Sequence, residues 1–214
     1  MSDRTNDYER LGGWRSLLQL VPVMNFVRSA LGRARVMQTV ASEYIKAEPG
    51  EFIVDFGCGV AGILPFLDAI QYVGVDVDEN YIERARHVHG ERGTFMSADL
   101  LTVSSDAFPK ADIVLVRGFL HHLDDGHAEA ILKLAAEVLK PDGRLITIDP
   151  VKIEGQNPIA RLLISLDRGS HIRFEKGYRA LIEQAFSPER LESRTDLLRL
   201  PYAHCVSVSR SGAR

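Results

Sequence analysis

Short apolar runs that alternate with helical patterns between residues 51 and 150 constrain the fold more than any other feature of this sequence. Each run is short enough for a strand and apolar enough to be buried on both faces, which is typical of parallel sheets covered by helices. The alternation therefore predicts a doubly wound α/β fold with a mostly parallel sheet. The runs are residues 51–57, 72–77, 93–98, 111–117 and 143–150.

Helical patterns are expected between these strands and on both sides of the alternating region. The expected helices are residues 14–31 with a kink near Pro22, 33–47, 61–70, 79–90, 125–140, 158–167 and 175–186. A turn at 141–143 ends the longest of them. Two β-like stretches, 189–196 and 201–210, close the sequence and predict an antiparallel hairpin at the edge of the sheet.

Bulk properties narrow the class of protein. The length of 214 residues suits one domain, and the net charge of −3 gives no general attraction to nucleic acid. The two cysteines have no disulfide or metal-ligand spacing, so no metal is expected. The first ten residues lack a signal-peptide pattern, and no apolar run reaches the roughly 18 residues of a membrane span. These features favour a cytoplasmic protein.

The first strand leads directly into the spacing Gly57-x-Gly59-x-x-Gly62, which is typical of a nucleotide-binding turn. Glycines permit a tight turn and a close approach of the backbone to a ligand. Asp76 ends the next strand, and a carboxylate at that position suits hydrogen bonds from ribose hydroxyls. Asp55 lies just before the glycines, where it would repel a pyrophosphate and attract a cation. S-adenosylmethionine combines a ribose with positive charge and no phosphate, so it fits this pattern better than NAD does.

Five segments in this order resemble the class I S-adenosylmethionine-dependent methyltransferases, over about residues 50–150. VDFGCGVAG is similar to the family's glycine-rich first motif, and GVDVDENYIERAR is similar to its second strand and ribose-binding acid. SADL, DIVLVRGFLHHLDD and EVLKPDGRLITID resemble the segments that follow. The resemblance implies a seven-stranded sheet of order 3-2-1-4-5-7-6 with the last strand antiparallel, in agreement with the expected hairpin. It departs at Val60-Ala61, where many members have Thr-Gly, which removes one hydroxyl contact.

The resemblance also implies which residues bind the cofactor. The glycine loop would approach its methionine part, with Asp55 near the ammonium group, and Asp76 would bind the ribose. Val77 would pack on the adenine, Asp99 would reach the adenine amino group, and the Leu100 backbone would face the ring. Arg117 would meet the cofactor through its backbone, and Arg35 would meet the cofactor carboxylate. The expected cofactor-binding residues are Asp55, Gly57, Cys58, Gly59, Asp76, Val77, Asp99, Leu100, Arg117 and Arg35.

The acceptor is expected outside the carboxyl ends of the strands, where ligands bind in doubly wound sheets. His121 and His122 follow the fourth strand, so either is a candidate general base, although a packing role for a histidine there is the alternative. Asp149, Arg168, His171 and Tyr202 are the expected substrate-binding residues. The resemblance divides the chain into a helical lid or extension, 1–48, and a methyltransferase domain, 49–214, with acceptor-selecting elements in 150–205.

The expected function is methyl transfer to an oxygen, nitrogen or carbon of a small organic molecule. The alternatives are a methyltransferase for nucleic acid or protein, and a cofactor-binding module without catalysis. Nucleic acid is disfavoured because the sequence has no basic, aromatic-interleaved strip and no Asn/Asp-Pro-Pro-aromatic motif. An NAD-dependent reductase lacks support because no plausible Tyr-x-x-x-Lys pair is present. The apolar stripe in 17–27 leaves three alternatives open: burial against the sheet, a homodimer contact or a membrane surface.

Overall fold

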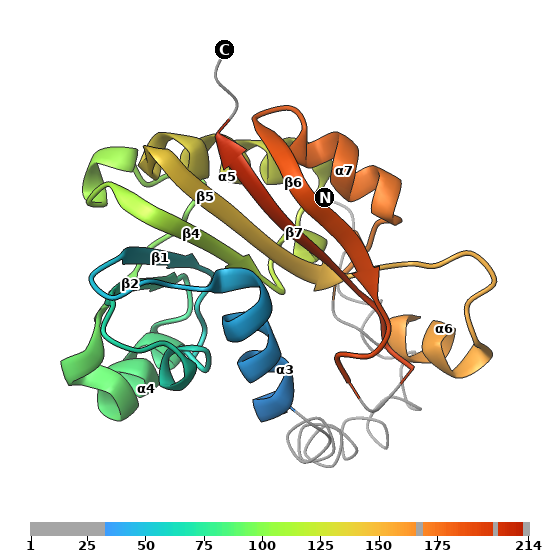
Figure 1. The fold of residues 1–214 in the computed structure, drawn as a ribbon, viewed down its shortest axis with the longest axis horizontal. Helices are drawn as coiled ribbons and strands as arrows, with labels where there is room; N and C mark the ends of the chain where they lie inside the picture. Colours follow the sequence, from blue (N-terminus) through green and yellow to red (C-terminus); the bar gives the residue numbers. More distant parts are fainter. Residues whose placement is uncertain (1–32, 166–168, 199–200, 212–214) are drawn as a thin grey trace, which may run out of the picture.

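A seven-stranded sheet of order β3-β2-β1-β4-β5-β7-β6 forms the centre of the protein (Figure 1). The computed structural model describes residues 33–165, 169–198 and 201–211. Neighbouring strands from β3 to β5 pair in parallel, whereas β7 is antiparallel to both β5 and β6. This confirms the predicted doubly wound sheet, its strand order and its antiparallel last strand.

The elements follow the predicted alternation closely. The strands are β1 (Phe52–Phe56), β2 (Gln71–Asp76), β3 (Thr94–Ser97), β4 (Ala111–Arg117), β5 (Leu139–Pro150), β6 (Phe186–Arg194) and β7 (His204–Ser211). The helices are α3 (Arg33–Val40), α4 (Glu79–His89), α5 (Asp125–Val138), α6 (Pro158–Ser165) and α7 (Glu175–Ile182). Shorter turns are the π-helical η1 (Ala41–Ile45) and the 3-10 turns η2 (Leu64–Phe66), η3 (Gly90–Arg92), η4 (Ser105–Ala107) and η5 (Leu120–His122).

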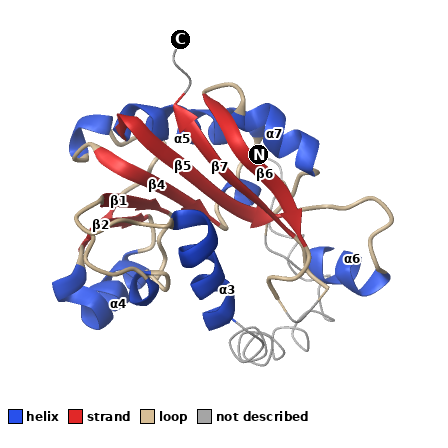
Figure 2. Ribbon diagram, viewed as in Figure 1, coloured by secondary structure: helices blue, strands red, loops and turns tan. Residues whose placement is uncertain are grey.

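Helices cover both faces of the sheet, with α5 and α7 on one side and α3 and α4 on the other (Figure 2). Alternate residues of each strand enter the two cores, because successive side chains point to opposite faces. Val54 and Val114 pack in the core with α5 and α7, whereas Ile53 and Ile113 pack in the core with α3 and α4. The same alternation places the side chain of Asp55 on the α3 and α4 side.

Side-chain caps explain where two of the helices begin. The Asp78 carboxylate accepts a hydrogen bond from the backbone of Asn80 and starts α4. The Asp124 carboxylate accepts one from the backbone of His127 and starts α5. Both carboxylates satisfy backbone donors that the first turn of a helix leaves unpaired. These caps lie just after β2 and after the loop that follows β4, so they fix the chain on the side where the strands end.

The helix predicted for residues 61–70 is absent, which corrects that prediction. The segment instead forms turns and the short η2, because Ala61 and Ala69 adopt left-handed backbone angles with φ of 50° and 51°. Pro65 has no N–H for a regular helix, and its ring fits the start of η2. The apolar side chains of this segment are buried all the same, so their spacing resembled that of a helix. Those buried side chains belong to Ala61, Ile63, Leu64 and Leu67.

Other boundaries shifted without changing the fold. The predicted turn at 141–143 lies within β5, which pairs with β4 from Leu139 onward and has an irregular register near Ala111. The helix predicted for 33–47 consists of α3 and η1, and the helix predicted for 14–31 lies outside the described residues. None of the helices that the structure describes is long and apolar enough to cross a membrane.

Candidate cofactor and acceptor site

The loops that follow the carboxyl ends of β1, β2, β4 and β5 bring most of the predicted residues together. Parallel strands end at the same edge of a sheet, and Figure 1 shows the arrowheads of β4 and β5 at that edge. Asp55 and the glycine loop come from β1, and Asp76 ends β2. His121 follows β4, and Asp149 lies at the end of β5. The site is therefore assembled from segments far apart in the sequence.

The glycine loop turns sharply because two of its glycines are left-handed. Gly57 and Gly59 have φ of 69° and 55°. A Cβ on Gly57 would lie 2.8 Å from Cδ2 of Phe119, whereas a Cβ on Gly59 would meet nothing within 4 Å. Cys58 between them is buried, and its backbone N–H donates to the Val75 carbonyl at 2.9 Å. The loop is thus held against β2, with open space beside Gly59.

Asp76 holds this loop with its carboxylate. Oδ2 accepts a hydrogen bond from the Gly59 N–H at 2.9 Å, and Oδ1 accepts one from the Asp78 N–H at 3.0 Å. A carboxylate has about four lone-pair sites, so both oxygens retain capacity for the hydroxyls of a ribose. The next side chain, Val77, is 71% exposed, which is unusual for valine and suits contact with a flat apolar ligand.

The loop after β3 lies on the same side of the sheet, at the carboxyl ends of the parallel strands. Asp99 is exposed, and its Oδ1 accepts a hydrogen bond from the Leu101 N–H at 2.9 Å, which leaves Oδ2 for a ligand. Leu100 is buried with the α5 core, so its side chain anchors the loop. Leu101, which the sequence prediction did not name, is 41% exposed. Val77 and Leu101 give this part of the edge two exposed apolar side chains near two carboxylates.

Asp55 is fully buried and already paired with a cation of the protein. Arg117 Nη2 donates to Asp55 Oδ2 at 2.9 Å, and the Tyr72 hydroxyl donates to the same oxygen at 2.6 Å. The charge argument from the sequence was therefore incomplete, because it treated Asp55 as a free anion. Burial lowers the pKa of Arg117, but Asp55 and Tyr72 more than offset this and raise it overall. Burial, with the Asp55 charge beside it, raises the pKa of Tyr72 well above its usual value.

One acceptor and one donor in this cluster stay unused. Asp55 Oδ1 and Arg117 Nε are both buried and find no hydrogen-bond partner among the described residues. Arg117 also donates a weak hydrogen bond from Nη1 to the Met37 sulfur of α3 at 3.3 Å, so α3 lies against the cluster. Arg35 is on the same helix but is exposed and makes no hydrogen bond or ion pair with the described part of the chain. The Asp55 oxygen is chemically complementary to the ammonium group of an amino-acid zwitterion, and the Arg117 N–H is complementary to its carboxylate.

His121 and Asp149 form a buried pair on the side of the site where the sequence predicts the acceptor. His121 Nδ1 lies 2.7 Å from Asp149 Oδ1, and the His121 backbone N–H donates to the same oxygen at 3.1 Å. Burial raises the pKa of Asp149, although its hydrogen bonds with His121 act in the opposite direction. Asp149 Oδ2 is buried without a hydrogen-bond partner in the described chain. His122 is exposed, and its ring centroid lies 4.0 Å from that of His121.

The chain before α7 packs directly on His121. The His171 backbone N–H donates to the His121 carbonyl at 2.9 Å, while the His171 residue as a whole is exposed. A Cβ on Gly169 would lie 2.0 Å from Cδ2 of the His121 ring, so only glycine fits there. Arg173 donates to carbonyls on both sides of His121. The sequence pointed to the polar segment 166–173 as a loop over the acceptor, but it singled out Arg168 and His171 rather than Gly169 and Arg173, because no local pattern reveals these long-range contacts. Arg168 lies outside the described residues.

Tyr202 joins the same side from the stretch before β7. Its side chain is buried with Ile164 of α6 and Ile172, which places it beside the segment that covers His121. Its ring lies 5.2 Å from that of His204 at an angle of 62°. Among the described residues no group of His, Cys, Asp and Glu side chains is arranged to hold a metal ion.

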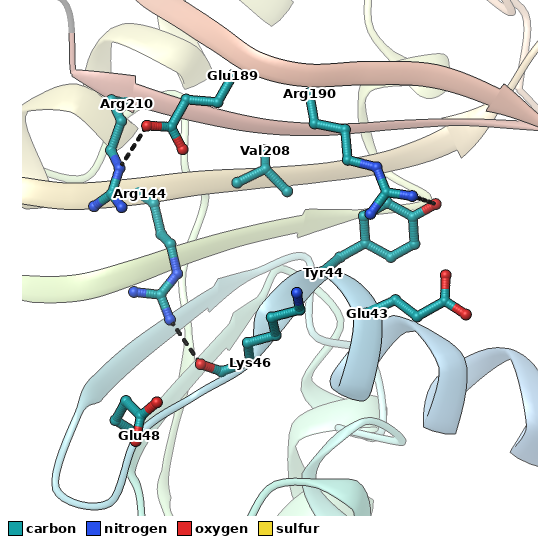
Figure 3. A pocket seen from close by; sticks show the side chains of 9 residues that line it. All are labelled: Glu43, Tyr44, Lys46, Glu48, Arg144, Glu189, Arg190, Val208 and Arg210. Atoms are coloured by element: carbon teal, nitrogen blue, oxygen red, sulfur yellow. Dashed lines mark hydrogen bonds and ion pairs between the residues drawn. The ribbon is translucent and has the colours of Figure 1, made fainter.

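A groove of about 380 Å³ lies at the opposite edge of the sheet, where the parallel strands begin (Figure 3). Its arginines already have partners: Arg144 donates to Glu51, and Arg210 donates to Glu189. Arg190 lies over the Tyr44 ring at 4.3 Å. The groove is therefore a gap in the packing between η1 and strands β5, β7 and β6, and the charges of these arginines are already paired or stacked. Its lining residues are Glu43, Tyr44, Lys46, Glu48, Arg144, Glu189, Arg190, Val208 and Arg210.

Comparison with known proteins connects this geometry to a family. The sequence profile of a family described as "Methyltransferase domain" matches residues 54–145. The O-methyltransferase gsfB of Penicillium aethiopicum is 29% identical over 120 residues, which cover 54% of this chain and 27% of that protein. The chain thus spans about a quarter of the length of this curated relative.

Solved structures share the fold. A TehB-like SAM-dependent methyltransferase from Corynebacterium glutamicum superposes with a TM-score of 0.67 at 16% identity, over 92% of this chain and 99% of that one. Magnesium protoporphyrin IX methyltransferase (ChlM) from Synechocystis PCC 6803, solved with bound SAH, superposes with a TM-score of 0.60 at 24% identity, over 89% and 84% of the two chains.

The residues that match the family profile include the glycine loop, Asp76, Asp99 and the β4 strand with its His121 loop. These are the segments on which the sequence resemblance rested, and the structure brings them to one edge of a sheet with the strand order that the resemblance implied. Residues 54–145 therefore match a family of methyltransferase domains, and the chain shares its fold with S-adenosylmethionine-dependent methyltransferases.

Proposed function

We propose that this protein transfers the methyl group of S-adenosylmethionine to a small organic molecule. The observation that carries the proposal is the buried His121–Asp149 pair at the same sheet edge as the Asp76-bound glycine loop. A cofactor-binding module without catalysis has no need of a histidine oriented by a buried carboxylate next to its ligand. The relative gsfB is named an O-methyltransferase, which makes a hydroxyl oxygen the first acceptor atom to test.

The unused polar groups match the cofactor's methionine end. Asp55 Oδ1 would accept hydrogen bonds from its ammonium group, directly or through water, and Arg117 Nε would donate to its carboxylate. This gives the Arg117 side chain a role in addition to the backbone contact expected from the sequence. Gly57, Cys58 and Gly59 would bring their backbone to the same part of the cofactor, because their loop is fixed to β2.

The adenosine end would lie over the loops after β2 and β3. Asp76 would accept the ribose hydroxyls with its remaining lone pairs, and the exposed Val77 would pack on the adenine. Asp99 Oδ2 would accept from the adenine amino group, with the Leu100 backbone facing the ring. We further propose that residues 1–48 cover this side as a lid. The described part of that segment supports this, since Met37 of α3 contacts Arg117.

S-adenosylmethionine supplies an electrophilic methyl group when bound and leaves as S-adenosylhomocysteine. An ionised Asp149 can only accept, so His121 Nδ1 carries a hydrogen, and Nε2 would be the atom that takes the proton of the acceptor group. Asp149 Oδ2 would accept a hydrogen bond from the acceptor or from a water beside it. Elements in 150–205, including Arg168, His171 and Tyr202, would select the acceptor by enclosing it.

The cofactor assignment is tested by calorimetry with S-adenosylhomocysteine and with NAD as the competing ligand. The wild type should bind the former and not the latter. Asp76→Asn should weaken binding about 10- to 100-fold, since a hydrogen bond to a charged group contributes roughly 1.5–3 kcal/mol. Asp142→Asn, at an exposed position near the start of β5, is the matched control and should bind as the wild type does. Binding of NAD instead would overturn the proposal.

The catalytic assignment is tested by screening metabolite extracts with isotope-labelled S-adenosylmethionine for products one methylene heavier. His121→Gln should lower kcat by about 10²–10⁴-fold, the range of general acid–base catalysis, with S-adenosylhomocysteine affinity almost unchanged. His122→Gln separates the two histidines and should have the smaller effect, because His122 is exposed and Asp149 orients His121. Equal loss of turnover and of cofactor affinity in His121→Gln would assign that residue a structural role.

A further inference from the structure

We propose that Arg173 is a positioning residue for methyl transfer, which fixes the loop carrying His121 to the segment that covers the acceptor side. The inference rests on the proposed function and goes beyond it, because Arg173 touches neither His121 nor Asp149 through its side chain in any described contact. It acts through the backbone on both sides of His121.

All five N–H groups of the Arg173 guanidinium are used. Nη1 donates to the Leu120 carbonyl at 2.9 Å and to the His171 carbonyl at 3.1 Å. Nη2 donates to the Leu123 carbonyl at 2.8 Å and to Asp125 Oδ1 at 2.7 Å. Nε donates to the same Asp125 oxygen at 2.9 Å. A guanidinium has five donors in a planar fork, so this environment matches arginine in full.

These contacts hold residues that lie on both sides of His121 in the sequence. Leu120 and Leu123 belong to the loop that carries the two histidines, and Asp125 begins α5, which follows that loop. The backbone contact from His171 to the His121 carbonyl adds a connection only two residues away from Arg173. The loop after β4 therefore cannot shift relative to the covering segment without breaking several hydrogen bonds at once.

Arg173 also connects to the strand that ends in Asp149. Its backbone carbonyl accepts a hydrogen bond from the Lys152 N–H at 3.0 Å, three residues after Asp149. Its guanidinium lies 5.8 Å from the ring centroid of Tyr178, whose hydroxyl donates to the Pro150 carbonyl at 2.9 Å. The residue thus joins the two chain segments whose relative position sets the distance between His121 and Asp149.

The geometry of the fork matters more here than the charge. Asp125, the acid paired with Arg173, has an 87% exposed side chain, and solvent around its carboxylate weakens the charge attraction between the two side chains. The Arg173 side chain is only 11% exposed, and three of its hydrogen bonds go to backbone carbonyls. A lysine retains the positive charge but has three donors at one point, so it cannot reach these carbonyls together.

The test compares Arg173→Lys with Arg179→Lys and Asp125→Asn. Arg179 lies in α7 and pairs only loosely with Glu175 and Glu183, at 4.0 and 3.7 Å, so it serves as the matched arginine control. Asp125→Asn removes the charge of the acid but keeps an oxygen that accepts from the guanidinium. Each variant is measured by calorimetry with S-adenosylhomocysteine, by hydrogen–deuterium exchange of residues 118–127, and by the NMR signal of the His121 ring. Turnover is added with the acceptor identified by the screen.

Arg173→Lys should bind S-adenosylhomocysteine as the wild type does, but show faster exchange in 118–127 and a displaced His121 signal. Its kcat should fall, by up to about 100-fold, since small misplacements of reacting groups have effects of that size. Arg179→Lys and Asp125→Asn should resemble the wild type. Wild-type exchange and an unmoved His121 signal in Arg173→Lys would overturn the inference even though the cofactor binds. Absence of cofactor binding to the wild type would instead overturn the proposed function itself.

Discussion

The three glycines of the Gly57-x-Gly59-x-x-Gly62 loop are expected to respond differently to the same substitution. Gly57 and Gly59 have left-handed backbone angles, whereas Gly62 is not among the residues with positive φ. A Cβ on Gly57 would also press on the Phe119 ring at 2.8 Å, but a Cβ on Gly59 or Gly62 would meet nothing within 4 Å. Replacement of each by alanine therefore separates backbone strain from steric overlap.

The expected changes in the free energy of unfolding follow from these backbone angles and contacts. Left-handed backbone costs an L-residue roughly 1–2 kcal/mol, so Gly59→Ala should lower the free energy of unfolding by about that amount. Gly57→Ala adds the overlap with Phe119, and overpacking costs about 1–3 kcal/mol, so its total should be about 2–5 kcal/mol. Gly62→Ala restricts the unfolded chain without native strain and should stabilise the protein by about 0.4–1 kcal/mol.

Urea unfolding followed by far-UV circular dichroism measures all three variants against the wild type. The reasoning predicts the order of stability Gly62→Ala, wild type, Gly59→Ala, Gly57→Ala, from most to least stable. Calorimetry with S-adenosylhomocysteine adds a second readout, because a methyl group on Gly59 would enter the open space beside the Asp76-bound N–H. If Gly62→Ala were as destabilising as Gly57→Ala, the assignment of distinct roles to the glycines would be wrong.

Three further predictions concern buried groups. Burial raises the pKa of both cysteine thiols, that of Cys205 to about 12. Ellman's reagent at mildly alkaline pH should therefore react slowly with the native protein, and should label two thiols per chain once the protein is unfolded. Fast labelling of the native protein would contradict this. Burial raises the pKa of Asp149, so its contribution to stability is complete below the unfolded carboxyl pKa of about 3.9 and is lost as pH rises through the folded value. The melting temperature of Asp149→Asn should therefore increase relative to that of the wild type as pH rises. A difference between the two melting temperatures that does not change with pH would refute this. Tyr72→Phe removes a donor from buried Asp55 and should cost about 1–3 kcal/mol in urea unfolding, so an unchanged midpoint would argue against that hydrogen bond.

The central sheet could be predicted because its strands carry a local signal. Buried parallel strands are apolar along their whole length, and β4 has the same bounds, 111–117, in the prediction and in the structure. The signal failed at 61–70, where buried side chains at near-helical spacing lie on a chain of turns. The left-handed angles of Ala61 and Ala69 result from how the loop meets the sheet, and a helical pattern in the sequence does not reveal this.

The glycine loop could be recognised in the sequence because Asp55, the glycines and Asp76 lie within a short stretch, at a spacing typical of nucleotide-binding turns. The partner of Asp55 was not visible, since Arg117 is 62 residues away and meets it only through the pairing of β1 with β4. The contact between Gly169 and His121 is also long-range, and it forms where the segment before α7 packs on the loop after β4. Sequence patterns therefore indicated candidate site residues, whereas the partners of these residues depend on how distant segments pack together in the fold.

The pairing of Asp55 with Arg117 has a consequence for how the chain folds. During synthesis, β1, β2 and β3 leave the ribosome before β4, so Asp55 at first lacks the cation that balances it. A buried carboxylate without its counter-ion is strongly unfavourable, which disfavours closure of the sheet centre around the first three strands alone. We expect this half-sheet to remain open until β4 inserts beside β1, so that the core and the glycine loop form in one step.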